Sequence, residues 1–182
     1  MNPIKKYIGD LYLSTRFYLA LGLCIVLFVV SFFVAEMFTV VNFILLVVTA
    51  LILIDYLFLF VFGKAPSAKR LAADRFSNGD ENKVELQVKN NMLFTVDMEI
   101  IDELPVQFQK RDWKLLHRFK AAGQKNILYK LRPVTRGAYE FGRIIIYVSS
   151  LLGLVKHRHN IEAKETVPVY PSFLQMRKYE LL

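Results

Sequence analysis

Two long apolar runs occupy the first third of the chain. Residues 17–35 contain no charged side chain, and neither do residues 37–54, after which apolar residues continue past Asp55 to Phe62. A helix that crosses the hydrocarbon core of a bilayer needs roughly 20 mostly apolar residues. The pattern therefore predicts two transmembrane spans, at about 17–35 and 37–62, and they are expected to be helices because backbone polar groups find no other partner in lipid. We expect a tight hairpin turn around residues 35–42.

A cleaved signal peptide is the alternative interpretation of the first run. The apolar core of such a peptide has about 7–15 residues and is followed by small residues at the cleavage site. Here the run is longer, and Phe32, Phe33 and Val34 stand where small residues would be needed. We therefore expect this helix to remain in the mature protein.

The hydrophobic period changes in the second part of the chain. Apolar and polar side chains alternate in residues 83–89 and again in 94–101, which is typical of half-buried strands. Further short β-prone runs lie at residues 113–121, 126–132, 141–149, 154–162 and 165–170. Turn residues recur between these runs, a spacing that predicts an antiparallel β-sandwich of the immunoglobulin-like class, with a small barrel as the structural alternative.

These patterns divide the chain into an anchor and a β-domain. Gly, Pro, Ser and charged residues follow Phe62, and Asn78-Gly79 is a tight-turn dipeptide. We expect a cytoplasmic N-terminal segment at 1–16, a linker at 63–79, the β-sandwich at 80–174 and the start of a further downstream region at 175–182.

Composition and charge sharpen this division. The chain has 182 residues, 54% of them hydrophobic, whereas soluble domains average about 45–50%. Residues 64–182 carry 21 Lys or Arg and 13 Asp or Glu, which accounts for the formal net charge of +8. This distribution excludes a fully soluble protein, a polytopic transporter and a disordered chain.

Basic residues flank the helices on one side only. They are Lys5, Lys6 and Arg16 before the first helix, and Lys64, Lys69 and Arg70 after the second. The turn between the helices carries Glu36 and no basic residue. The positive-inside rule therefore predicts that both termini are cytoplasmic and that the β-domain lies at the cytoplasmic face.

Asp55 is the unusual residue of the second apolar run. An ionisable side chain within a span is often functional, and pairing with a partner helix is one interpretation. Residues 37–62 would form a helix of about 39 Å against about 30 Å of hydrocarbon, so the helix can slide until Asp55 reaches the headgroups. We favour this interfacial position.

The sequence offers little catalytic chemistry. It contains no phosphate-binding loop, no GxGxxG after a strand, and no HExxH, GxSxG or CxxC motif. Cys24, the single cysteine, excludes an intrachain disulfide. His157 and His159 share a strand face, but a zinc site needs three or four ligands, so a solvated face is the preferred interpretation. We expect no catalytic residue, no metal and no cofactor, and we assign Asp97 and Glu99 to an outward strand face.

One basic stretch with aromatic residues is a candidate contact surface. It covers residues 110–125, and its candidate residues are Lys110, Arg111, Trp113, Lys114, Arg118 and Lys120. Such a stretch can bind nucleic acid. Because the domain is expected to lie close to anionic lipid, we rank a solvated or lipid-facing surface first, an acidic protein partner second and nucleic acid last.

Several short motifs occur in a characteristic order. They are RFSNGDENKVELQVKNN, DELP, LRPVTRGAYEFGRI, SSLLGLVKHRH and TVPVYPS. The most specific are Arg136 to Gly142 (RGxYxFG), the pair Gly153-Leu154 and the ending Val169-Tyr170-Pro171. With the two preceding helices, this order resembles the N-terminal part of the bacterial domain of unknown function family fifty-eight over about residues 15–174.

The resemblance has implications beyond the pattern itself. It implies a protein of the bacterial cytoplasmic (inner) membrane, with a von Willebrand factor A-like domain downstream of this segment. Family genes usually lie beside genes for MoxR-type AAA+ ATPases, so such an ATPase is the implied partner in assembly, maturation or envelope stress response. No catalytic or metal-binding residue of the family can be assigned to a position here.

The resulting hypothesis is a non-catalytic, membrane-anchored scaffold or interaction module. Two alternatives remain open. The chain would be part of a membrane-bound enzyme if its catalytic part lies beyond residue 182, and the β-domain would be a basic module if it binds anionic lipid or nucleic acid.

Overall fold

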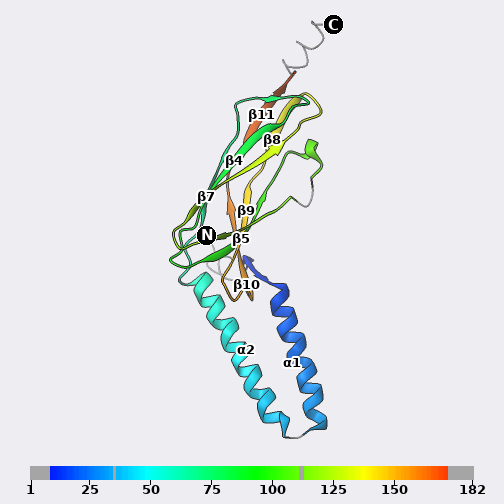
Figure 1. Cartoon of the computed structure of the whole chain (residues 1–182), viewed down its shortest axis with the longest axis vertical. Coiled ribbons are helices and arrows are strands. Elements are labelled where there is room, and N and C mark those ends of the chain that lie inside the picture. The colour runs from blue at the N-terminus through cyan, green and yellow to red at the C-terminus, as the bar shows by residue number, and fades with distance from the viewer. Residues whose placement is uncertain (1–8, 35, 111–112, 172–182) are drawn as a thin grey trace.

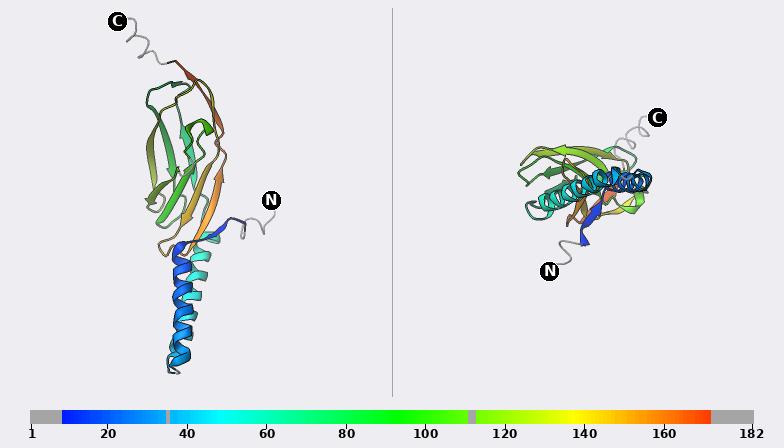
Figure 2. Two further views of the ribbon diagram at one scale, coloured as in Figure 1. Left: turned by 90° about the vertical axis from the view of Figure 1, so that its right-hand side faces the viewer. Right: turned by 90° about the horizontal axis from the view of Figure 1, so that it is seen from below.

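The computed structural model describes residues 9–34, 36–110 and 113–171. Helices α1 (Thr15–Phe33) and α2 (Met37–Phe60) form an antiparallel hairpin that projects from one end of an elongated β-domain (Figures 1 and 2). Both helices are long and apolar enough to span a membrane, and most of their large side chains are exposed. The prediction of two apolar helices is thus confirmed, although each ends about two residues earlier than expected.

Local interactions set the start of α1 and the end of α2. The Ser14 hydroxyl caps α1 by accepting a hydrogen bond of 3.3 Å from the backbone N–H of Phe17. At the same end of the hairpin, the Val61 N–H closes α2 with a bond of 3.0 Å to the Leu57 carbonyl. The two helices contact each other through buried Cys24 and Val41. Phe28 of α1 and Phe38 of α2 add an edge-to-face contact between the helices, with ring centroids 6.2 Å apart.

The largest sheet has five strands. Its order is β1 (Leu11–Leu13), β10 (Val155–Ile161), β9 (Ile144–Ser149), β5 (Val96–Asp102) and β6 (Leu115–Phe119). All neighbouring strands in it are antiparallel. Strand β1 precedes α1 directly, so the first helix is tied to the same sheet that contacts the second.

Two three-stranded sheets complete the domain. One has the order β2 (Ser67–Leu71), β4 (Asn82–Lys89) and β7 (Gln124–Leu131), and both of its pairs are antiparallel. The other has the order β3 (Phe76–Ser77), β11 (Glu165–Tyr170) and β8 (Gly137–Phe141). In that sheet β11 is antiparallel to β8 and parallel to β3. A short 3-10 helix at Val106–Phe108 follows β5.

The core forms where the inward faces of the sheets meet (Figure 2). Val84, Leu86 and Val88 of β4 are fully buried, and so is every second residue of β5. The alternation read from the sequence therefore gives the correct inward face of both strands. Tyr139 and Phe141 of the RGxYxFG motif are also buried, as their spacing predicts. The predicted fold class, two apolar helices followed by an antiparallel β-sandwich, is confirmed.

Two domain boundaries differ from expectation. The segment 63–79, predicted to be a linker, contains β2 and β3, which pair with β4 and β11. The segment 1–16, predicted to be a separate N-terminal segment, contains β1. Both strands of the former linker are short, and their neighbours supply the hydrogen bonds that a local pattern does not reveal. The region 175–182 lies outside the described residues.

Candidate functional site

Helix α2 enters the β-domain instead of ending above it. The side chains of Leu59 and Phe60, in its last turn, are buried in the same cluster that forms the core of the sandwich. Ile52 and Tyr56, further down the helix, pack against the edge of that cluster. The helix and the domain therefore share one apolar core, and the junction between them is the first candidate site.

Asp55 binds the loop between β9 and β10. Its Oδ2 atom accepts hydrogen bonds from the backbone N–H groups of Leu154, at 2.8 Å, and Val155, at 2.9 Å. Its Oδ1 atom accepts a hydrogen bond from the Ser150 hydroxyl. The Ser150 Oγ atom in turn accepts the N–H of Leu152 at 3.0 Å. Asp55 is fully buried, and its hydrogen-bond partners belong to the β-domain.

A row of four rings in contact continues this junction into the sheet. Tyr56 stacks on Phe60 with ring centroids 4.6 Å apart, and Phe60 stacks on His157 of β10 at 4.0 Å. His157 contacts His159 at 4.1 Å. The Nδ1 atom of His157 also donates a hydrogen bond of 3.3 Å to the Leu59 carbonyl. That bond satisfies one of the carbonyls that an α-helix leaves unpaired at its C-terminal end.

The prediction that the two histidines lie on a solvated strand face is therefore wrong. They do share a strand face, but that face is covered by α2, and His157 is buried. Burial, together with the neighbouring His157, lowers the pKa of His159 to about 4. Within residues 9–34, 36–110 and 113–171, no group of three or more His, Cys, Asp or Glu side chains is arranged to hold a metal. The pair acts as a structural contact between β10 and α2.

The start of α1 contacts the same β9–β10 loop. The Ser14 backbone N–H donates to the Leu154 carbonyl at 3.1 Å, and its hydroxyl donates to the Gly153 carbonyl. The Arg16 guanidinium donates to the carbonyls of Leu151 and Leu152, at 3.4 and 3.1 Å. Gly153 has a φ of +62°, a conformation that favours glycine in this loop. Both helices thus hold one loop between their ends.

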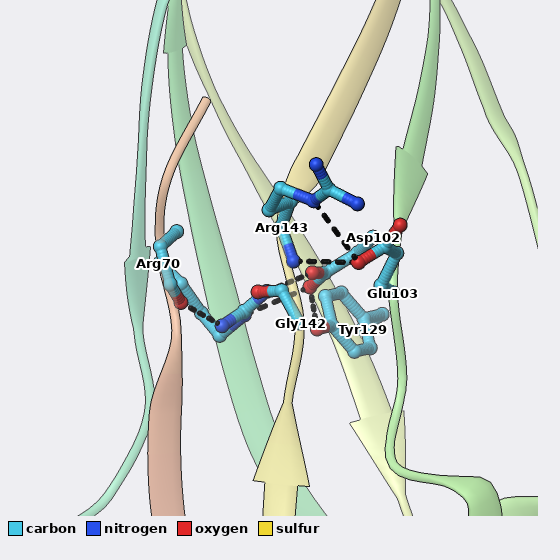
Figure 3. Close-up of polar contacts among 7 residues, drawn as sticks. Arg70, Asp102, Glu103, Tyr129, Gly142 and Arg143 are labelled. Carbon is cyan, nitrogen blue, oxygen red and sulfur yellow. Dashed lines mark hydrogen bonds and ion pairs between the residues drawn. The ribbon is translucent and has the colours of Figure 1, made fainter. Parts of the chain in front are cut away.

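A second polar cluster lies inside the sandwich (Figure 3). Arg70 of β2 and Asp102 of β5 form an ion pair whose side chains are 1% and 0% exposed. The Tyr129 hydroxyl of β7 donates to the Asp102 carboxylate. The Arg70 guanidinium also donates to the carbonyls of Ala163, at 2.6 Å, and Gly142, at 3.2 Å. Every partner comes from a different strand or connection, so the cluster ties the sheets together.

This cluster is enclosed in the core of the sandwich. Arg70, counted above among the basic residues that flank the membrane, is a core residue because its charge is paired and its donors are satisfied. Burial and the charge of Asp102 raise the pKa of Tyr129, so its hydroxyl stays protonated as a donor. The contacts of these three side chains hold β2, β5 and β7 together.

The turn after β8 has a close approach at Gly142. Its N–H donates to the Glu103 carbonyl at 2.8 Å, and the neighbouring Arg143 N–H donates to the Glu103 carboxylate at 2.8 Å (Figure 3). A Cβ atom at position 142 would lie 2.7 Å from the Glu103 Cβ atom. This contact explains why the RGxYxFG motif ends in glycine: no other residue leaves room for Glu103.

The predicted basic surface does not form one patch. Lys110 lies 4.6 Å above the Trp113 ring, and this pair is at the end of the domain away from the helices, because Leu115 pairs with Ile100 and Phe119 with Val96. Arg111 lies outside the described residues. Lys120, in contrast, is in the turn after β6, where its carbonyl accepts a hydrogen bond from the Asn90 side chain.

The middle of the same stretch is neutralised by ion pairs. Arg118 forms two hydrogen bonds with Asp97, at 2.7 and 2.9 Å, and they hold the pKa of Asp97 below its usual value. Lys114 lies 3.4 Å from the Glu99 carboxylate. Asp97 and Glu99 are on the outer face of β5, as predicted. A continuous cationic surface therefore does not extend from Lys110 to Lys120.

The domain is similar to several solved immunoglobulin-like domains. It aligns with the CARDB domain of the PF1109 protein from Pyrococcus furiosus, with 15% identity and a TM-score of 0.43, over 61% of this chain and 97% of that one. It also aligns with the ASH / PapD-like domain of human CEP192, with 10% identity and a TM-score of 0.41, over 58% of this chain and 86% of that one. No family model matches the sequence, and no curated protein does, so the resemblance to family fifty-eight stays a prediction.

Sequence reasoning identified Asp55 but missed its partner and the histidine contact. One signal was present: SSLLGL combines two serines and a glycine just before β10, a composition that favours a loop rich in free N–H groups. A loop of this kind needs an acceptor, and Asp55 supplies it from a residue nearly 100 positions earlier. The sequence alone does not bring the two together.

Proposed function

We propose that the protein is a non-catalytic, membrane-anchored scaffold or interaction module. One observation carries the proposal: α2 continues into the core of the β-domain through Leu59 and Phe60 and is locked there by Asp55. A flexible tether would allow the domain to search the space above the membrane. A shared core instead presents the domain in one orientation, which suits a fixed platform for a partner.

The β-domain is proposed to lie at the cytoplasmic face of a bacterial inner membrane. The distribution of Lys and Arg around the hairpin supports this orientation, because Lys64 and Lys69 follow α2 while Glu36 is the charged residue at the hairpin turn. A phosphatase or fluorescent reporter fused after Leu182 tests it. A fluorescent fusion that folds in the cytoplasm is expected, and activity of the phosphatase fusion alone would place the domain outside.

The proposed partner is a MoxR-type AAA+ ATPase. Support comes from the order of motifs that resembles family fifty-eight, above all RGxYxFG and the Val169-Tyr170-Pro171 ending. The residues of the first motif stabilise the fold, since Tyr139 and Phe141 are core residues and Gly142 accommodates Glu103. The partner surface would therefore be formed by residues outside the motifs.

The experiment is affinity capture with the full chain in detergent, on cytosol of the source cell. The control bait is an unrelated protein with a two-helix anchor, and each capture is performed with and without ATP. We expect an AAA+ ATPase, identified by mass spectrometry, to be enriched on the chain in a nucleotide-dependent manner. If no AAA+ ATPase exceeds the control in either nucleotide state, the partner assignment is wrong.

A further inference from the structure

Helix α1 is short compared with a bilayer, which determines how deep the loops at its N-terminal end must lie. Helix α1 has 19 residues. At about 1.5 Å per residue it is about 28 Å long, while the hydrocarbon core is about 30 Å thick. If α1 spans the membrane, it must therefore be immersed up to its first turn, at Thr15 and Arg16.

Helix α2 gives the same depth independently. From Met37 to Asp55 the helix extends about 27 Å at about 1.5 Å per residue. Because α1 ends and α2 begins at the same turn, Asp55 and Arg16 lie at nearly equal distances from it. The β9–β10 loop hydrogen-bonds to both of them. That loop therefore lies at the edge of the hydrocarbon rather than above the headgroups.

The side chains of this loop suit such a position. Leu151 is 63% exposed and Leu152 is 40% exposed, while the polar groups of the loop are bound by Asp55 and Arg16. Figure 1 shows the lower end of β10 reaching down between the upper ends of the two helices. The loop offers leucine side chains to its surroundings and few unsatisfied polar groups, which is what a lipid environment requires.

A second loop reaches nearly the same depth. Leu93, between β4 and β5, is 83% exposed, and the adjacent Phe94 contacts Phe58 of α2 with ring centroids 5.6 Å apart. Phe58 lies one turn above Asp55. An apolar groove lies beside these contacts, between α2 and the two loops. Ile54, Phe58, Phe94 and Leu151 contribute to its lining.

Basic residues surround these loops on the side of the domain. Lys64 follows α2, Lys89 is opposite Ser67, and Lys125 is opposite Val88, all at the end of the sandwich that contacts the helices. Lys120 lies in the turn bonded to Asn90 at that same end. Leucines at the hydrocarbon edge with lysines just above them match the layering of acyl chains and phosphates in a leaflet.

We propose that the β-domain is docked directly on the bilayer, with Leu93, Leu151 and Leu152 inserted at the hydrocarbon edge of the leaflet that it faces. The occupant of the groove is lipid acyl chain, because the groove is continuous with the lipid-facing surface of α2. The inference rests on the part of the proposed function in which the two helices span the membrane, and it does not depend on the identity of the partner.

Fluorescence quenching by brominated lipid tests this docking. The chain has one tryptophan, so Trp113→Phe gives a background without signal, into which Leu151→Trp or Leu93→Trp is introduced. Val134→Trp is the matched control: Val134 is 71% exposed, and it follows the end of β7 that is remote from the helices. Each full-length variant is reconstituted into phosphatidylcholine vesicles with bromine at carbons 6 and 7 of one acyl chain, and into vesicles without bromine.

We expect Leu151→Trp and Leu93→Trp to lose most of their emission in brominated vesicles, while the emission of Val134→Trp is the same in both kinds of vesicle. In vesicles without bromine, the two loop variants should emit at shorter wavelength than Val134→Trp. Leu152→Trp is a second variant of the first loop, and an unchanged proteolysis pattern verifies that each variant is folded. Equal emission of all variants in both kinds of vesicle would overturn the proposal, because the loops would then be covered by protein or held above the surface.

An alkaline carbonate wash separates this inference from the proposed function. If the chain is extracted by the wash, the helices do not span the membrane and both proposals are wrong. If the chain resists extraction and the loop tryptophans are not quenched, the docking inference alone is wrong. If they are quenched but no AAA+ ATPase is captured, docking stands and the partner assignment is wrong.

Discussion

The Asp55 carboxylate of α2 accepts a hydrogen bond of 2.9 Å from the backbone N–H of Val155, the first residue of β10. This bond joins a residue of an apolar helix to the start of a strand in the largest sheet. An acidic residue in a membrane-grade helix is costly unless its oxygens are satisfied. Here three donors, from the β9–β10 loop and the start of β10, satisfy both oxygens of Asp55. The Asp55 side chain therefore connects the helical anchor to the β-domain.

We expect Asp55→Leu to destabilise the junction. The substitution leaves the buried N–H groups of Leu154 and Val155 without an acceptor, at about 1–3 kcal/mol for each. Asp55→Asn retains one acceptor oxygen and should cost less. The midpoint of thermal unfolding, measured by circular dichroism in one detergent, gives the comparison. Leu53→Ala, at an exposed position of the same helix, is the control, and equal midpoints for Asp55→Leu and this control would contradict the assigned role.

Stability should fall between pH 6.5 and pH 5 because of His159. Its pKa is lowered to about 4 in the folded chain, below the usual 6.5, so the neutral form is favoured on folding. The unfolded chain then binds more protons than the folded chain in this window. The free energy of unfolding therefore decreases as pH falls. The stabilisation is complete above pH 6.5 and is lost as pH decreases toward 4.

Chemical denaturation at several pH values between 5 and 7.5 measures this slope. His159→Gln should flatten it, because the titrating imidazole is removed. His117→Gln removes an imidazole from β6, the edge strand on the other side of the sheet from β1, and serves as the control. A slope that survives His159→Gln would assign the pH dependence to other groups. Asp97 contributes little to this slope, because the hydrogen bonds from Arg118 lower its pKa and move its titration to more acidic pH.

The buried pair of Arg70 and Asp102 should be far more sensitive than the surface pair of Arg118 and Asp97. Arg70→Leu leaves a buried carboxylate without its partner, a change that costs about 3–5 kcal/mol. Arg118→Leu removes an exposed pair that solvent screens, so it should cost far less. Denaturant unfolding of both variants gives the two values. Similar losses for the two would show that Arg70 is not enclosed as described.

Gly142→Ala should destabilise the chain through overpacking. The new Cβ atom would meet Glu103 atoms at 2.7 Å or less, so the turn must shift, at about 1–3 kcal/mol. The same substitution at Gly22 of α1 is the control, since a Cβ there meets no atom within 4 Å and alanine favours helix. Thermal unfolding compares them. A stable Gly142→Ala variant would mean that Glu103 moves freely away.

The sequence alone determined the elements with strong periodicity. Uninterrupted apolar runs predicted two helices, because lipid tolerates few other backbone forms. Alternation predicted the strands at 83–89 and 94–101 and which of their side chains face the core, since successive side chains of a strand point to opposite sides. Tyr139 and Phe141 are two residues apart on β8, so both face the core for the same reason. Each of these properties is local, so it can be read from neighbouring residues.

Tertiary structure decided the contacts between remote segments. Asp55 finds its donors nearly 100 residues later, His157 stacks on Phe60, and Arg70 pairs with Asp102 across two sheets. Each of these polar residues would be assigned to a surface from local pattern, because burial of a polar group is unfavourable until a partner is present. The partner comes only from the arrangement of the sheets and helices. The same arrangement divides the basic stretch between the two ends of the domain, since side chains adjacent in sequence follow an extended strand along its length.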